Sequence, residues 1–263
     1  MYSVTQRIKQ IKQPYGGYIN KKLFDINYLN GDELDIKQEN ISPSTVGLVV
    51  DYLTRLHFEK DIFKVFDISL RGFNLNKVIE RDIYNQLIDL LVSVKLHTIQ
   101  SDELIKVACL VAPYDAIYRA GIPANQIAPK MPNEATIRHI RIMVNRTIKL
   151  FENSKQLFTN ITFSGGYTNV ISTGDGDFAT EDTIYDLKVS KQGLNSKQTL
   201  QIYLYYLLAK KSGQNKYKNI NKIAIYNPRL DVKYICNVKD ISEDIEENVK
   251  YNVMGIERRD DYW

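Results

Sequence analysis

The chain has 263 residues, of which 44% are hydrophobic, so it can bury one large core or a core with an added helical region. Its net charge of +4 and its pI near 8.8 are compatible with a polyanionic partner without requiring one. With only two cysteines, Cys109 and Cys236, the sequence excludes a disulfide framework, a four-cysteine zinc site and an iron–sulfur cluster held by four cysteines.

Two features of the sequence bear on where the protein resides. Residues 1–13 lack the apolar stretch of a secretory signal. No run of about 18 apolar residues occurs anywhere in the chain, so no membrane span is expected. We therefore expect a soluble, cytoplasmic protein whose thiols are reduced.

The first 156 residues are expected to be mainly helical after a polar beginning. Residues 1–41 are polar and weakly periodic, and we interpret them as an N-terminal arm. Residues 42–59 predict a helix, because Ser42 suits the N-cap and Pro43 suits the first helical position. Three further helices are expected, over residues 75–96, 101–120 and 134–153, the last preceded by a proline-containing loop over 121–132. Residues 42–156 thus form a mainly helical region that includes the first helix of the core.

From residue 157 the pattern becomes that of strands. β-Branched and aromatic residues broken by glycine pairs indicate hairpins up to residue 178. Then follow a strand over residues 183–190, a helix over 196–213, strands over 221–228 and 232–241, and a helix from Glu243. We expect Ser196 to cap the helix over 196–213 and Gly213 to end it. This order predicts an α/β fold in which residues 157–263 form a core with a mixed central β-sheet flanked by helices, and a helical region is inserted before it.

Asp186 and Lys188 lie two residues apart within an apolar predicted strand, so their side chains share one face. If the preceding segment forms a hairpin that turns near residues 180–182, Asp177 lies opposite Asp186 on the adjacent strand. Two close carboxylates repel unless a cation lies between them, and hard oxygen ligands suit Mg²⁺ or Mn²⁺. Lys188 would stand beside the metal, where it could position a water or stabilise negative charge. Such an arrangement suits attack on a phosphodiester.

Three motifs in this part of the chain resemble the PD-(D/E)xK nuclease superfamily, most of all its RecB-type and lambda-exonuclease-type branch. The sequence GDGD at 174–177 matches G-x-x-D, DLK at 186–188 matches D/E-x-K, and QIYLY at 201–205 matches Q-x-x-x-Y. The resemblance covers roughly residues 157–238. It implies a restriction-endonuclease-like core and a Mg²⁺- or Mn²⁺-dependent activity that hydrolyses DNA.

The resemblance also implies a role for each matched residue. Asp177 and Asp186 would hold the metal, and the backbone carbonyl of Leu187 would complete its coordination. Lys188 would orient the attacking water. Gln201 and Tyr205, four residues apart on one helical face, would border the pocket and contact either the DNA or the lysine.

The family also takes a metal ligand from an upstream helix, often in the pattern G-x-x-x-H. Here Gly47 is followed four residues later by Asp51, which departs from the pattern although Asp is an acceptable ligand for a hard cation. Asp51 could instead pair with Arg55 on an exposed helix face. Glu59 is then the alternative ligand from this helix.

Other interpretations of these residues remain open. Asp186 and Lys188 could be a solvated pair on an exposed hairpin, and Tyr205 could be a core residue of a tyrosine-rich helix. The same fold could serve a catalytically silent nucleic-acid-binding or interaction protein. It could also serve a hydrolase that acts on RNA or on a small molecule.

Basic residues and histidines outside the motifs have less specific meanings. The helix from Glu134 carries a basic series that could track phosphates, although a solvated helix face is the commoner meaning; its members are Arg138, Arg141, Arg146 and Lys149. Arg229 could approach DNA or belong to an ordinary hairpin turn. The three histidines lack metal-ligand spacing and are expected to be structural; they are His57, His97 and His139.

Overall fold

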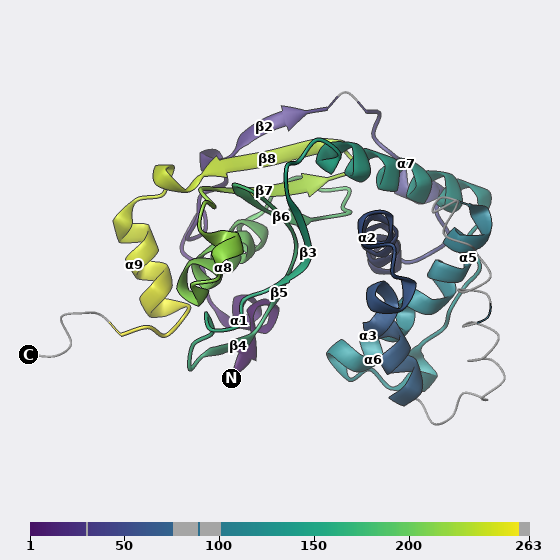
Figure 1. Cartoon of the computed structure of the whole chain (residues 1–263), viewed down its shortest axis with the longest axis horizontal. Helices are drawn as coiled ribbons and strands as arrows, with labels where there is room; N and C mark the ends of the chain where they lie inside the picture. The colour runs from purple at the N-terminus through teal and green to yellow at the C-terminus, as the bar shows by residue number, and fades with distance from the viewer. Residues whose placement is uncertain (30, 76–88, 90–100, 258–263) are drawn as a thin grey trace, which may run out of the picture.

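The computed structural model describes residues 1–29, 31–75, 89 and 101–257, and this part of the chain forms two lobes (Figure 1). The sheet lobe contains a six-stranded sheet with helices α1, α8 and α9. The helical lobe contains α2, α3, α5, α6 and α7. Each lobe has its own cluster of buried hydrophobic side chains. None of the described helices is long and apolar enough to cross a membrane.

The central sheet is mixed, as the sequence predicted. In spatial order its strands are β2 (Asp25–Tyr28), β8 (Val232–Asn237), β7 (Lys222–Asn227), β6 (Thr183–Leu187), β5 (Asp175–Thr180) and β3 (Leu157–Thr162). Only β6 and β7 pair in parallel, and all other neighbours are antiparallel. A parallel pair needs a crossover connection, and helix α8 (Ser196–Ser212) supplies it. An α/β fold with helices beside a mixed sheet is therefore confirmed.

Helix α8 is buried around most of its circumference. The sheet covers one side of it, and α1 (Val4–Gln10) and α9 (Glu243–Asn252) lie beside it in the same lobe (Figure 1). Its N-cap is Asn195 rather than the expected Ser196, because the Asn195 side chain accepts hydrogen bonds from the N–H groups of Lys197 and Gln198. Gly213 ends the helix in the left-handed conformation, as predicted.

Residues 1–41, expected to form an arm, contribute several elements to the sheet lobe. Strand β1 (Tyr2–Ser3) pairs in parallel with β4 (Ile171–Thr173), and β2 is an edge strand of the main sheet. Helix α1 follows β1 directly and packs against α8. These elements are too short to produce a clear period in the sequence, and their partners lie far along the chain.

The helical lobe is built from α2 (Pro43–Glu59), α3 (Ile62–Leu75), α5 (Asp102–Val111), α6 (Asp115–Ala120) and α7 (Glu134–Phe151). The Ser42 hydroxyl accepts a hydrogen bond from the Thr45 N–H, so α2 begins as predicted. The expected helix over 101–120 is wrong in one respect: it breaks at a 3₁₀ turn over Ala112–Tyr114, which contains Pro113. Proline lacks the N–H that would continue the α-helix.

Helix α3 was not predicted. The helix expected over residues 75–96 lies outside the described residues except for Leu75 and residue 89, and so does His97.

Arg229 lies in the connection between β7 and β8 and is fully buried. Its guanidinium donates hydrogen bonds to both carboxylate oxygens of Glu39, at 2.6 and 2.9 Å, and to the carbonyl of Leu34. The Nδ1 atom of His139 lies 2.9 Å from the same carboxylate, so this histidine is structural, as expected. The possibility that Arg229 approaches DNA is wrong, because its side chain has no access to solvent.

The basic series on α7 also makes contacts within the protein. Arg146 donates to the backbone carbonyls of Pro228 and Asp32. Arg138 donates to Gln38, and Arg141 pairs with Asp102. Three of the four basic side chains are therefore engaged within the protein, which disfavours the interpretation of this helix face as a phosphate track.

We predict that Glu39→Ala lowers the free energy of unfolding by about 3–5 kcal/mol, because it leaves the buried Arg229 guanidinium without its carboxylate partner. Urea denaturation followed by circular dichroism measures this. The control Glu103→Ala, on an exposed part of α5, should change stability by less than about 0.5 kcal/mol. Equal stability of the two variants would contradict the assigned importance of the Arg229–Glu39 pair.

Candidate functional site

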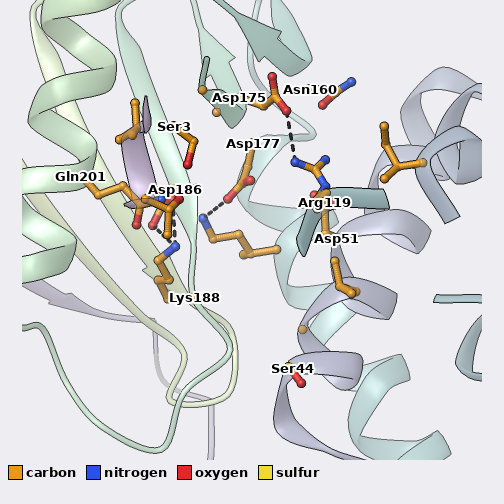
Figure 2. A pocket seen from close by; sticks show the side chains of 18 of the residues that line it. Ser3, Ser44, Asp51, Arg119, Asn160, Asp175, Asp177, Asp186, Lys188 and Gln201 are labelled. Carbon is orange, nitrogen blue, oxygen red and sulfur yellow. Dashed lines mark hydrogen bonds and ion pairs between the residues drawn. The ribbon is translucent and has the colours of Figure 1, made fainter. Parts of the chain in front are cut away.

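A cavity of about 930 Å³ lies between the two lobes. The sheet lobe lines it with residues of α1, β5 and α8 and with the end of β6 (Figure 2). The helical lobe lines it with residues of α2 and α6. Four carboxylates and four basic side chains line the cavity: Asp51, Asp175, Asp177 and Asp186, with Lys9, Arg55, Arg119 and Lys188.

Asp177 and Asp186 occupy neighbouring strands, as the sequence predicted. Strands β5 and β6 pair in antiparallel fashion, with Phe178 opposite Tyr185, and the turn falls at residues 181–182. The next position of this register brings Asp177 beside Asp186. The Asp177 carboxylate accepts a 2.6 Å hydrogen bond from the N–H of Leu187, which fixes its orientation toward the end of β6 (Figure 2).

Lys188 is held by Asp186. Its ammonium nitrogen lies 3.0 Å from Oδ1 and 2.8 Å from Oδ2 of the Asp186 carboxylate (Figure 2). The Asp186 side chain is 2% exposed and that of Lys188 is 28% exposed, so the interpretation of this pair as solvated is wrong. Both groups instead line the cavity between the lobes.

The environment shifts the pKa values of this cluster in directions that have clear causes. Burial raises the pKa of Asp186 to about 6; Lys188 opposes this shift, and Asp177 adds to it. Burial likewise raises the pKa of Asp177, against the effects of Lys188 and of the Leu187 N–H. Burial alone would lower the pKa of Lys188, but the Asp186 and Asp177 carboxylates outweigh it and raise that pKa, so the side chain stays charged.

Asp51 reaches the cavity from helix α2 of the other lobe (Figure 2). It pairs with Arg55 at 3.5 Å, but the expectation that this pair lies on an exposed helix face is wrong, because the Arg55 side chain is buried. Burial raises the pKa of Asp51 to about 7, with Arg55 opposing the shift and Asp177 adding to it. The Oδ1 atom of Asp51 is buried and accepts no hydrogen bond.

Glu59, the alternative ligand, does not line the cavity. Its carboxylate contacts Arg55 at 3.3 Å, Lys64 at 2.7 Å and the Thr159 hydroxyl at 2.6 Å. These three partners satisfy Glu59 and join α2 to β3. Of the two candidates on this helix, Asp51 is therefore the one placed to bind a cation.

Gln201 and Tyr205 share one face of α8, and both line the cavity. The Gln201 amide donates a 2.8 Å hydrogen bond to the Tyr205 hydroxyl. Burial, followed by the nearby Asp186 and Asp177, raises the pKa of Tyr205, so its hydroxyl keeps its proton. The Tyr205 ring also stacks on Phe163 at 5.4 Å, so its body belongs to the core while its hydroxyl faces the site.

Leu187 occupies the position between the two charged residues of the strand. Its N–H group is bound by Asp177, and its side chain packs against the hydrophobic cluster of the helical lobe. The resemblance to the nuclease superfamily implied a role for its carbonyl, and the residue lines the cavity.

Sequence reasoning missed two basic residues of the cavity, Lys9 and Arg119. Arg119, at the end of α6, forms an ion pair with Asp175 of β5 at 3.1 Å (Figure 2). Asp175 is part of the GDGD motif but had no role assigned to it. No local pattern marks Arg119, because its contact with Asp175 spans 56 residues of the chain.

The donor set fits a hard divalent cation in its chemistry. Asp51, Asp177 and Asp186 supply carboxylate oxygens, and the free Oδ1 atom of Asp51 is a buried acceptor that lacks a positive partner. Within the described part of the chain, no three His, Cys, Asp or Glu side chains already stand at metal-ligating spacing. Binding a cation would therefore require these carboxylates to draw together.

Comparison of the chain with protein-family models, with curated proteins and with solved structures finds no match. The geometry and chemistry of the cavity are therefore the basis for assigning a function.

We predict that Asp51→Asn stabilises the metal-free protein at pH 8. Because folding raises the Asp51 pKa from 3.8 to about 7, the folded state binds this proton more tightly, and stability falls as pH rises from about 4 to about 7. Asparagine has no such charge, so the variant should gain at most about 4 kcal/mol at pH 8, the equivalent of three pKa units.

Urea denaturation in EDTA at pH 4 and pH 8 measures this difference, and the gain should shrink toward pH 4. The control Asp25→Asn, on the exposed strand β2, should show no such pH-dependent gain. A variant that is less stable than the wild type at pH 8 would contradict the incompletely compensated charge assigned to Asp51.

Proposed function

We propose that this protein is a divalent-metal-dependent deoxyribonuclease that hydrolyses phosphodiester bonds, built on a restriction-endonuclease-like core. The observation that carries the proposal is the cluster of Asp177, Asp186 and Lys188 at the paired ends of β5 and β6, inside the cavity and facing Asp51. A chain that gathers three carboxylates and an ammonium in one partly dry site needs a use for their charges, because burying them is costly.

In this proposal, Asp177, Asp186 and Asp51 hold Mg²⁺ or Mn²⁺, with the Leu187 carbonyl as a further ligand. When bound, the cation would polarise the phosphodiester and lower the pKa of an attacking water. Asp177 is already oriented by the Leu187 N–H, and the free Oδ1 atom of Asp51 is available as a ligand.

Lys188 is the residue proposed to act on the reacting groups. An ammonium has three donors, so contact with Asp186 leaves at least one for a water or for a phosphate oxygen. A positive charge held beside the reacting groups stabilises the negative charge that develops during hydrolysis. Its raised pKa keeps it protonated at neutral pH.

Gln201 and Tyr205 are proposed to position the substrate beside this lysine. The Tyr205 hydroxyl accepts from Gln201 and keeps its own proton, so it can donate to a phosphate or to a bound water. Stacking on Phe163 limits the motion of the ring, so the donor is held at a defined place.

A catalytically silent nucleic-acid-binding protein is the alternative that one observation favours. The four carboxylates of the cavity are matched by four basic groups, so the site can exist without a metal. The two functions are separated by incubating the purified chain with linear, circular and single-stranded DNA in Mg²⁺, Mn²⁺ or EDTA. Metal-dependent cleavage supports the nuclease, whereas binding without cleavage of any form supports the alternative.

We predict that Mn²⁺ binding depends on Asp186 and weakens in acid. Isothermal calorimetry should show binding at pH 8 that Asp186→Asn greatly weakens. The control Asp175→Asn, on the same strand as Asp177 but outside the proposed ligand set, should bind normally. The pKa values of Asp51 and Asp186 are raised to about 7 and about 6, so protons compete with the cation below these values.

Affinity should accordingly fall as pH decreases from 8 to 6, and protons should be released on binding. If the Asp186→Asn variant and the wild type bind Mn²⁺ with equal affinity, Asp186 is not a ligand and the proposed metal site is wrong.

We predict that Lys188→Ala lowers the cleavage rate by about 10²–10³-fold while Mn²⁺ binding is retained, because an ammonium stabilises charge without ligating a cation. Single-turnover cleavage and calorimetry measure the two effects. The control Lys9→Ala removes another lysine that lines the cavity and should change the rate much less. Cleavage by Lys188→Ala at the wild-type rate would exclude the assigned role.

A further inference from the structure

Arg119 extends from the helical lobe across the cavity toward the strand that carries Asp177 (Figure 2). It lies at the C-terminal end of α6, in a part of the chain that none of the nuclease-like motifs covers. Its Nη1 atom contacts Oδ2 of Asp175 at 3.1 Å. Asp175 is two residues from Asp177 in the same strand, so Arg119 is a cation beside the proposed metal ligands without being paired to them.

The Nε edge of the Arg119 guanidinium is held by a hydrogen bond within the helical lobe. Its Nε atom donates a 3.0 Å hydrogen bond to Oδ2 of Asp115, a carboxylate that is almost fully buried. The Tyr52 hydroxyl donates to the same oxygen at 2.8 Å and fixes Asp115 in turn. Asp115 and Tyr52 therefore hold the guanidinium in place whatever occupies its other edge.

The partner at the other edge is far easier to displace. The Asp175 side chain is 36% exposed, and the Arg119 side chain is 43% exposed. An ion pair with this much access to water contributes little to stability, typically about 0–1 kcal/mol. A phosphodiester shares one negative charge between two oxygens, as a carboxylate does. The parallel N–H groups of an arginine guanidinium can therefore bind either group.

We propose that Arg119 binds a phosphate of the nucleic acid, and that Asp175 is a displaceable counter-ion that occupies Arg119 when nucleic acid is absent. This inference rests on the proposed function, because it takes nucleic acid to be the ligand of the cavity. It assigns a binding role to the helical lobe: α6 contributes the phosphate contact, and the sheet lobe contributes the metal ligands and Lys188.

The test measures DNA affinity by fluorescence anisotropy with a labelled oligonucleotide, with Ca²⁺ in place of Mg²⁺. Arg119→Ala should weaken binding by roughly tenfold or more and should reduce the slope of log affinity against log salt by about one. Asp175→Asn should strengthen binding by roughly two- to fivefold, because it frees Arg119. In the Arg119→Ala background, Asp175→Asn should have no effect.

A matched control separates release of Arg119 from loss of a negative charge. Asp182→Asn frees Lys222 from a pair of similar exposure, 37% for each partner, at the opposite end of β5 and away from the cavity. It should leave DNA affinity unchanged. Arg119→Gln, which can still donate to Asp115, serves if Arg119→Ala does not fold, and it should show the same loss of affinity.

Two results from the variants would overturn the inference: unchanged DNA affinity in the folded Arg119 variant, or an Asp175→Asn gain that persists without Arg119. A wild-type chain that binds no DNA would also overturn it. The proposed function is decided separately by cleavage: a wild-type protein that binds DNA through Arg119 but never cuts it retains this inference and loses the nuclease activity.

Discussion

Four carboxylates line one cavity, and basic side chains beside them balance their charge. Lys188 contacts Asp186, Arg55 contacts Asp51, and Arg119 contacts Asp175. For the buried carboxylates of Asp186 and Asp51, the basic partner offsets part of the loss of hydration, which would otherwise favour the neutral form. The raised pKa values of Asp51 and Asp186 show that this compensation is incomplete.

The incomplete compensation depends on how the two lobes meet. The sheet lobe supplies Asp177 and Asp186 through a hairpin whose strand pairing fixes their separation, and the helical lobe supplies Asp51. Leu187 packs against the helical lobe, and Glu59 of that lobe bonds to Thr159 of the sheet. A cation drawn between the carboxylates would remove the remaining repulsion, so the same feature that destabilises the metal-free site would favour binding of a metal.

Much of the sheet side of this site could be predicted, because its determinants are local. The turn at residues 181–182 and the two-residue spacing of Asp186 and Lys188 place the charges once a hairpin is assumed. The spacing of Gln201 and Tyr205 likewise places them on one helical face. The start of α2 followed from its Ser42-Pro43 cap.

The remainder depends on contacts that no local pattern contains. Strand β2 pairs with β8 across some 200 residues of chain, so its segment looks like a polar arm in the sequence. The burial of Arg55 and the partial burial of Asp51 follow from packing between the lobes, whereas the sequence left open whether Asp51 is a metal ligand or pairs with Arg55 on an exposed face. Arg229 is neutralised by Glu39, 190 residues away. The break at Pro113 is different, because a proline inside a helical pattern is itself a local signal for the end of a helix.

If these carboxylates form one metal centre served by Lys188, crystals soaked in Mn²⁺ should diffract with an anomalous difference peak within coordination distance of Asp177 and Asp186. Asp51 should then have moved toward the peak, and Lys188 should lie beside it. The metal centre would be contradicted by a map that has no peak in the cavity at saturating Mn²⁺ and in which Asp186 still forms its ion pair with Lys188.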